Sequence, residues 1–209
     1  MTPPNAFRLP PSPLPGFRRR RGQVAALEET LVPPGEGPLL IAVCGLPGAG
    51  KSSFAAALAE RLGLAVVGVD PLEAALVRAG IDDRQPKGQA AYLAAETVAE
   101  AQLRTGLGVV VDAVNDLAEN RAQWVRLASR TGADLRWIEV VCSDPTTHRL
   151  RLQQREREED PFIGVPEWDS LNRRRRQLAI WKDPRLVLDS LHHTPDELAA
   201  LAVQELGLG

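Results

Sequence analysis

Cysteine, aromatic residues and net charge are all scarce in this sequence. Its 209 residues include two cysteines and one tyrosine, and aromatic side chains make up 4% of the chain. Both cysteines, Cys44 and Cys142, end apolar runs, and we expect small buried residues rather than a disulfide, in a reducing compartment. The 25 basic and 27 acidic residues leave a net charge of −2, which excludes a general attraction to nucleic acids or anionic membranes.

A long hydrophobic run is missing as well. No apolar run approaches the ~20 residues that span a bilayer. The N-terminus carries prolines and arginines where a secretory segment has its apolar core. We therefore expect a cytoplasmic protein without a membrane partner.

The composition divides the chain into a tail and a domain. Residues 1–36 are rich in proline and arginine and are predicted to form an N-terminal tail that ends in a short helix over Gln23 to Leu31. Its four consecutive arginines, Arg18 to Arg21, fit either a solvated arm or a contact with nucleic acid or another partner. Residues 37–209 are long enough for one α/β domain.

Five apolar runs of strand length alternate with helical segments in this domain. They are Leu39–Cys44, Leu64–Asp70, Gly108–Asp112, Asp134–Cys142 and Leu186–Asp189. The alternation predicts a parallel sheet with helices on both faces. Helix starts are indicated by Ser143 or Asp144 before one helix and by a capping box that opens at Thr194.

A glycine-rich turn follows the first apolar run and precedes an alanine-rich helical segment. The residues Gly45–Ser52, "GLPGAGKS", match the P-loop pattern with a strand before and a helix after. Backbone N–H groups of such a loop surround phosphate oxygens, Lys51 reaches the β- and γ-phosphates, and Ser52 is placed to bind Mg²⁺. The predicted ATP-binding residues of the loop are Gly45, Leu46, Pro47, Gly48, Ala49, Gly50, Lys51, Ser52 and Ser53.

The residues after the loop favour phosphate transfer over hydrolysis. The Asn-Lys-x-Asp segment by which GTPases read guanine is not found in the sequence. A motor ATPase has an acidic residue directly after its Walker B aspartate, whereas "GVVVDAVND" has Ala113 after Asp112. Because nothing obvious is positioned to activate water, a bound hydroxyl is the favoured acceptor.

Two aspartates end apolar runs, Asp70 in "LAVVGVD" and Asp112 in "GVVVD". Ligands of open parallel sheets bind at the carboxyl ends of the strands, so both side chains are expected to face the nucleotide crevice. The alternative for each is a cap on the following helix. For Asp70 the following Pro71 supports that alternative.

Taken together, these segments resemble a known group. "GLPGAGKSS", "VGVD", "GVVVDAVNDLAENRAQWVRLA" and "IEVVCSDPTTHRLRLQQR" are similar to the small P-loop kinases often labelled AAA-family ATPases. Their relatives include gluconate kinase, chloramphenicol phosphotransferase, the zeta toxins and phage polynucleotide kinase. The resemblance covers roughly Leu39 to Leu206. It implies a three-layer P-loop NTPase fold with strand order 2-3-1-4-5 and a small helical lid, here at about residues 155–181.

The resemblance also implies roles for single residues. The group's general base falls on Asp70 and its third-strand aspartate on Asp112, so Ser52 and Asp112 are the expected Mg²⁺ ligands. The arginine after that strand falls on Arg121, and the lid arginines that clamp the phosphate fall on Arg151 and Arg155. Lys51, Asp70 and Arg155 are then the catalytic residues, while Arg121 and Arg151 join the loop in binding ATP.

The leading interpretation is an ATP-dependent kinase for a small molecule with a hydroxyl group, bound by residues within Leu72–Tyr92. One alternative is a polynucleotide 5′-end kinase, for which the arginine runs, including Arg173 to Arg176, are the only motivation. The acidic balance and scarce aromatics argue against nucleic acid. Another alternative is a nucleotide-dependent switch or toxin-like protein. We expect a monomer or homodimer, and histidines in structural or surface roles, namely His148, His192 and His193.

Overall fold

The structure is a computed structural model that describes residues 37–81, 84–158, 162 and 168–208. The chain divides into two units, Met1–Leu31 and Val32–Gly209, and all described residues belong to the second. The predicted N-terminal tail, with its short helix and arginine run, lies outside the described residues. Part of the predicted lid does so as well.

The centre of the fold is one sheet of five parallel strands. The strands are β1 (Leu39–Cys44), β2 (Ala65–Gly68), β3 (Val109–Asp112), β4 (Asp134–Val141) and β5 (Leu186–Asp189). They lie in the order β2-β3-β1-β4-β5, and every neighbouring pair is parallel. The predicted fold class and strand order are therefore confirmed.

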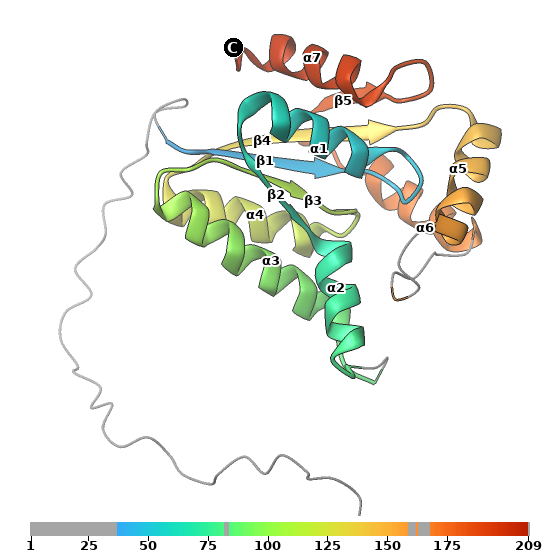
Figure 1. Cartoon of the computed structure of the whole chain (residues 1–209), viewed down its shortest axis with the longest axis horizontal. Helices are drawn as coiled ribbons and strands as arrows, with labels where there is room; N and C mark the ends of the chain where they lie inside the picture. The colour runs from blue at the N-terminus through green and yellow to red at the C-terminus, as the bar shows by residue number, and fades with distance from the viewer. Residues whose placement is uncertain (1–36, 82–83, 159–161, 163–167, 209) are drawn as a thin grey trace, which may run out of the picture. The chain divides into compact units, whose positions relative to one another are not determined.

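Helices cover both faces of the sheet and its carboxyl edge (Figure 1). The helices are α1 (Lys51–Leu62), α2 (Val69–Arg78), α3 (Lys87–Arg104), α4 (Ala118–Thr131), α5 (Pro145–Glu158), α6 (Trp168–Ala179) and α7 (Pro195–Leu206). In Figure 1, α1 and α7 lie above the sheet and α3 and α4 below it, while α5 and α6 lie beyond the tips of the strands. None of the helices in the described part of the chain is long and apolar enough to cross a membrane.

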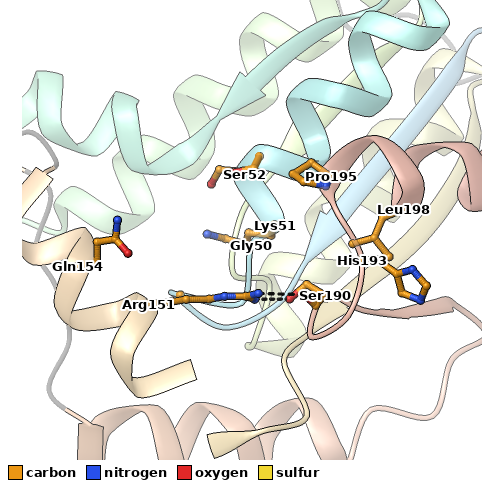
Figure 2. A pocket seen from close by; sticks show the side chains of 11 residues that line it. Gly50, Lys51, Ser52, Arg151, Gln154, Ser190, His193, Pro195 and Leu198 are labelled. Atoms are coloured by element: carbon orange, nitrogen blue, oxygen red, sulfur yellow. Dashed lines mark hydrogen bonds between the residues drawn. The ribbon is translucent and has the colours of Figure 1, made fainter. Parts of the chain in front are cut away.

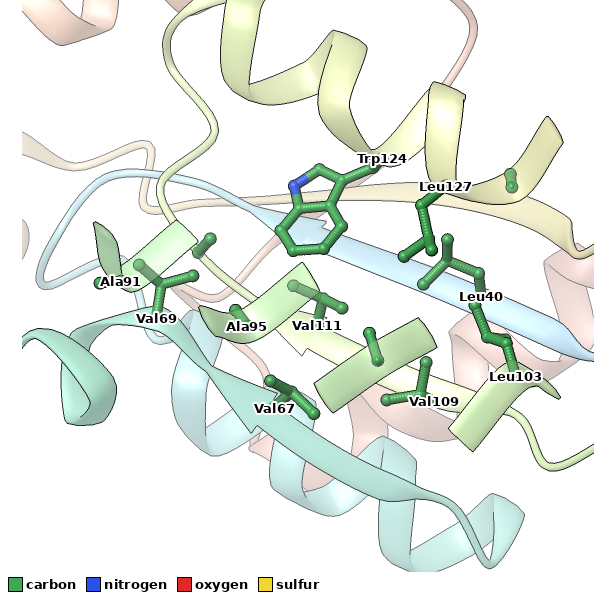
Figure 3. Close-up of a cluster of buried hydrophobic side chains, with 13 residues drawn as sticks. Leu40, Val67, Val69, Ala91, Ala95, Leu103, Val109, Val111, Trp124 and Leu127 are labelled. Atoms are coloured by element: carbon green, nitrogen blue, oxygen red, sulfur yellow. The ribbon is translucent and has the colours of Figure 1, made fainter. Parts of the chain in front are cut away.

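Side chains alternate between two cores along the inner strands β1 and β3, as expected for a strand covered on both faces. Leu40 and Val111 face a cluster with Trp124 of α4, which Figure 3 shows between the sheet and the helices α3 and α4. Ile41 and Val110 face the opposite cluster, which includes residues of α1 and α7. Both clusters are fully buried at these strand positions, so the sheet is held from both sides.

The second strand is shorter than its apolar run predicts. The expected strand Leu64–Asp70 is observed as Ala65–Gly68, and Asp70 lies in the first turn of α2. Pro71 explains the difference, because its fixed φ favours the first turn of a helix and its missing N–H is no loss there. Asp70 therefore stands at a helix start, just past the carboxyl end of the strand.

The predicted helix starts agree with the structure. Asp144 Oδ2 accepts a hydrogen bond of 2.6 Å from the Thr147 N–H at the start of α5. Thr194 and Glu197 form a complete capping box at the start of α7. Both cysteines are free thiols; Cys44 is buried and Cys142 is half-buried.

Candidate active site

The loop between β1 and α1 takes a conformation that requires glycine. Gly45, Gly48 and Gly50 have φ angles of 142°, 81° and 90°, a region that residues with a Cβ rarely adopt. At Gly45 a Cβ would also lie 2.3 Å from the Val140 carbonyl oxygen. The backbone of this loop can therefore approach its neighbours, and a ligand, more closely than other residues allow.

Helix α1 begins inside this loop without a side-chain cap. Its N-cap residue is Gly50, and Lys51 is the first helical residue. The N–H groups of a first helical turn have no acceptor within the helix, and the helix dipole adds positive charge there. The start of α1 is thus a site for an anion such as phosphate.

A cavity of about 330 Å³ lies beside the loop. Figure 2 shows its walls, which come from the loop and α1, from α5, and from the segment that leads from β5 into α7. The lining residues are Gly48, Gly50, Lys51, Ser52, Ser53, Arg151, Gln154, Ser190, His193, Pro195 and Leu198. The cavity joins the glycine-rich loop and the start of α1 to the apolar side chains Pro195 and Leu198 of α7.

Two hydrogen-bonded side chains support the wall of this cavity. Arg151 donates to Ser190 Oγ at 2.7 Å and to the Ser190 carbonyl at 3.0 Å, as the dashed lines in Figure 2 mark. Ser190 Oγ in turn donates to the Ala49 carbonyl at 2.8 Å. This chain of bonds connects α5 to the loop through the end of β5.

Lys51 lies between the two aspartates that the sequence singled out. Its Nζ is 3.8 Å from Asp70 Oδ2 and 3.9 Å from Asp112 Oδ1, and Lys51 is only 2% exposed. Strand β3 pairs with β1 and with β2, so Asp112 stands next to the loop strand and Asp70 one strand further out. The sheet therefore gathers one buried cation and two carboxylates at its carboxyl edge.

Asp112 retains an oxygen that could serve a metal ion. Its Oδ1 is buried and has no hydrogen-bond partner among the described residues. Mg²⁺ keeps most of its ligands as water and phosphate oxygens and needs only one or two from the protein, so such an oxygen fits it. Ser52, exposed in the first turn of α1, offers a hydroxyl on the cavity side.

The loop after β3 is held in an unusual conformation. Asn115 is buried and has a positive φ of 54°, which Asn tolerates better than most residues. Its Nδ2 donates to Val43 O at 3.1 Å, its Oδ1 accepts from Trp124 Nε1 at 2.9 Å, and its N–H donates to Tyr92 Oη at 3.0 Å. Burial raises the pKa of Tyr92, so the hydroxyl stays neutral. Asn115 thereby ties this loop to β1, α3 and α4.

A family model described as AAA domain matches residues 40–178 of this chain. The chain belongs to this family. The AAA domain match begins in β1 and ends in α6, so it includes the loop, Lys51 and both aspartates.

Several solved structures share this AAA domain fold. A protein from Chloroflexus aurantiacus is 20% identical with a TM-score of 0.62, over 84% of this chain and 100% of its own. The Mycobacterium tuberculosis APS kinase, solved with AMPPNP and APS, is 22% identical with a TM-score of 0.57, over 84% of this chain and 99% of its own. A gluconokinase from Sinorhizobium meliloti is 22% identical with a TM-score of 0.51, over 82% and 93%. No match was found among the curated proteins.

These findings confirm the resemblance to the small P-loop kinases as a matter of family and fold. The structure brings part of the predicted site together: one cavity is lined by Gly48, Gly50, Lys51, Ser52, Ser53 and Arg151, and Asp70 and Asp112 contact Lys51 from outside its lining. Arg121 is not among the lining residues. It donates to the Asn115 and Asp116 carbonyls at 2.9 and 2.8 Å, and its guanidinium lies 4.7 Å from the Trp181 ring centroid. Its contact with ATP stays a prediction.

Arg155 is a further predicted residue that cannot be placed in the site. Its backbone belongs to α5, but its side chain lies outside the described part of the chain. Ser190 and Asn115, in contrast, shape the site and were not predicted. Ser190 directly follows the carboxyl end of β5, which is the edge where parallel sheets bind ligands. That rule could have pointed to Ser190, whereas the role of Asn115 depends on contacts with three distant elements.

Proposed function

We propose that this protein is an ATP-dependent phosphotransferase that passes the γ-phosphate to a hydroxyl group of a small molecule. The observation that carries the proposal is the position of Lys51 between Asp70 and Asp112 at the end of a P-loop. The charge of Lys51 suits the transferring phosphate, and the two carboxylates, at the carboxyl ends of neighbouring strands, suit the metal and the acceptor. The fold of the family supports the same reading, since an APS kinase and a gluconokinase share it.

ATP fits the cavity along α1. The β- and γ-phosphates would be held by the loop N–H groups, the start of α1 and Lys51. The apolar side chains Pro195 and Leu198, together with His193, line the far end and suit the base. Ser52 and Asp112 would hold Mg²⁺, which neutralises charge on the phosphates when bound.

Asp70 is the proposed general base. It accepts the proton of the acceptor hydroxyl, whose oxygen forms a new bond to the γ-phosphorus. The bond between that phosphorus and the bridging oxygen of ADP breaks, and the proton leaves Asp70 for solvent with the products. Lys51, beside Asp70, offsets the negative charge on the oxygens of the transferring group.

The position after Asp112 supports transfer rather than hydrolysis. It holds Ala113, which is fully buried and carries no group that could orient a water molecule. The acceptor would bind near Asp70, within the segment Leu72–Tyr92, which runs from α2 into the first turns of α3.

The test is a transfer screen with γ-labelled ATP and Mg²⁺ against sugars, antibiotics, nucleosides and oligonucleotide ends. We expect a labelled small-molecule product that is formed by the wild-type protein and not by the Lys51→Ala variant. Labelled oligonucleotide ends would instead favour the end kinase. Release of inorganic phosphate with no labelled product, at equal rates for all mixtures, would contradict the proposal.

A further inference from the structure

We propose that His148 is a positioning residue that sets the orientation of the Pro47–Gly48 peptide, and so directs the Gly48 N–H toward the phosphates. The inference rests on the proposed function, because it assigns a role within the ATP site. Of the structural or surface role expected from the sequence, the buried ring of His148 fits the structural one, and the inference adds a consequence for ATP binding.

The loop segment Leu46–Ala49 forms a turn whose central peptide can adopt two orientations. The Ala49 N–H donates to the Leu46 carbonyl at 3.0 Å, with Pro47 and Gly48 between them. Proline at the second position and glycine with a φ of 81° at the third are typical of a type II turn. Rotation of the central peptide by about 180° would convert it to a type I turn, which the same ends also allow.

His148 holds the carbonyl of this central peptide. Its Nε2 lies 2.8 Å from Pro47 O, and the residue is 1% exposed. The loop packs closely on α5 at this point, since a Cβ on Gly48 would lie 3.2 Å from His148 Cδ2 and 3.4 Å from Leu152 Cα. A trans peptide is planar, with its C=O and N–H pointing in opposite directions. Fixing Pro47 O toward α5 therefore turns the Gly48 N–H to the other side of the loop, where Gly48 lines the nucleotide cavity.

The surroundings of the ring favour the tautomer that this role requires. Pro47 O can only accept, so Nε2 carries the proton and Nδ1 is an acceptor. Arg175 of α6 lies on that side, with Nη2 at 3.5 Å from Nδ1. Burial lowers the pKa of His148, as do the nearby Arg175 and Arg151, while the bond to Pro47 opposes them. The neutral ring thus donates to the loop with one nitrogen and faces a cation with the other.

Two amide substitutions separate this role from packing. In His148→Gln the terminal amide can reach the position of Nε2 and donate to Pro47 O, whereas in His148→Asn the amide reaches only the position of Nδ1. His148→Met fills a similar volume without a donor. AMPPNP binding with Mg²⁺ is measured by calorimetry for each variant, and thermal melting identifies the folded ones. His192→Asn, on an exposed histidine outside the cavity lining, is the matched control.

We expect His148→Gln to bind AMPPNP within about twofold of wild type. His148→Asn and His148→Met, which cannot donate to Pro47 O, should bind AMPPNP about 3- to 10-fold more weakly if they fold, as for one lost hydrogen bond. In transfer assays the same loss should raise KM for ATP and leave kcat at saturation nearly unchanged. Equal affinity in all folded variants would overturn the inference. Equal weakening in His148→Gln, His148→Asn and His148→Met would overturn it as well. If wild type does not bind AMPPNP, the proposed function fails instead.

Discussion

At the scale of single residues, the site is organised around the charge of Lys51. This side chain is almost completely buried, and its ammonium has carboxylates within 4 Å on two sides. A buried charge is stable only when it is paired, so the two aspartates hold Lys51 in place before a nucleotide arrives. The phosphates of ATP would then add to, or replace, these contacts.

Lys51→Ala removes this charge. We expect phosphotransfer to be lost and the Kd for Mg·ATP to rise roughly 10- to 100-fold, because a hydrogen bond to a charged group contributes about 1.5–3 kcal/mol. Calorimetry with ATP and Mg²⁺ measures the affinity directly. Lys182→Ala, at an exposed position, should bind as wild type does. Unchanged affinity and turnover in Lys51→Ala would remove the P-loop from the mechanism.

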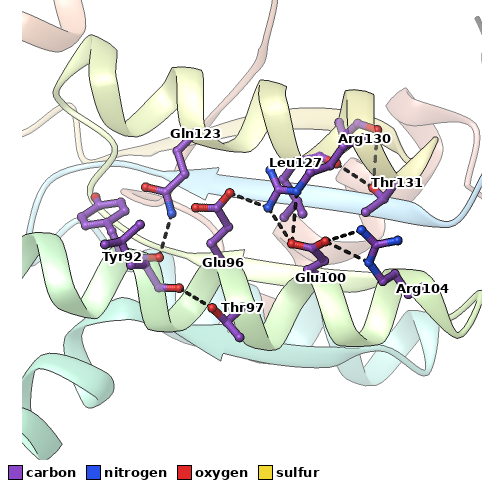
Figure 4. Close-up of polar contacts among 11 residues, drawn as sticks. Tyr92, Glu96, Thr97, Glu100, Arg104, Gln123, Leu127, Arg130 and Thr131 are labelled. Atoms are coloured by element: carbon purple, nitrogen blue, oxygen red, sulfur yellow. Dashed lines mark hydrogen bonds and ion pairs between the residues drawn. The ribbon is translucent and has the colours of Figure 1, made fainter. Parts of the chain in front are cut away.

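At the scale of elements, a network of charged side chains joins α3 to α4 on the face away from α1 (Figure 4). Arg130 of α4 lies 2.6 Å from Glu96 and 2.7 Å from Glu100, both on α3. Arg104 approaches the other oxygen of Glu100 to 2.6 Å. The hydrogen bonds from Arg130 and Arg104 lower the pKa of Glu100 from 4.5 to about 2. The network stabilises the helix pair that covers one core of the sheet.

Glu100→Gln should therefore lower the free energy of unfolding in a pH-dependent way. A carboxyl with a lowered pKa in the fold contributes its full stabilisation above its ordinary pKa of 4.5, and loses it as the pH falls through about 2. Denaturant unfolding at pH 7, 3.5 and 2 measures the free energy of unfolding. The difference in this free energy between wild type and variant should decrease toward pH 2. Glu60→Gln, at an exposed position of α1, is the control. A difference in the free energy of unfolding that stays constant over this pH range would show that the ion pairs of Glu100 do not stabilise the fold.

At the scale of the whole molecule, features encoded by contiguous residues could be predicted and long-range contacts could not. The P-loop, the alternation of strands and helices and the capping box at Thr194 are local patterns, and they appear as expected. The order of the strands came from the family resemblance. The end of β2 was missed by two residues, because apolar composition continues past Gly68 into a helix that Pro71 initiates.

The contacts by which His148 and Ser190 hold the glycine-rich loop could not be predicted, for a physical reason. His148 bonds to a residue 101 positions away and Ser190 to one 141 positions away. Such contacts depend on which strands are neighbours and on how the helices pack against them. The spacing of residues along the sequence predicts neither. The hydrogen bonds from Arg121 to the loop after β3 were likewise not predicted, and its contact with ATP stays a prediction.

The most direct measurement of the central claim compares Asp70→Asn with Asp112→Asn, using the acceptor that the transfer screen identifies. Asp70 lies one strand further from the loop than Asp112, so we expect Asp70→Asn to bind Mg·ATP nearly as wild type does while turnover falls by ~10²–10⁴-fold, the usual effect of losing a general base. Asp112→Asn should instead raise the Mg²⁺ concentration needed for activity. If Asp70→Asn disrupts Mg·ATP binding and Asp112→Asn spares it, the two roles are reversed, and the acceptor binds on the other side of the P-loop.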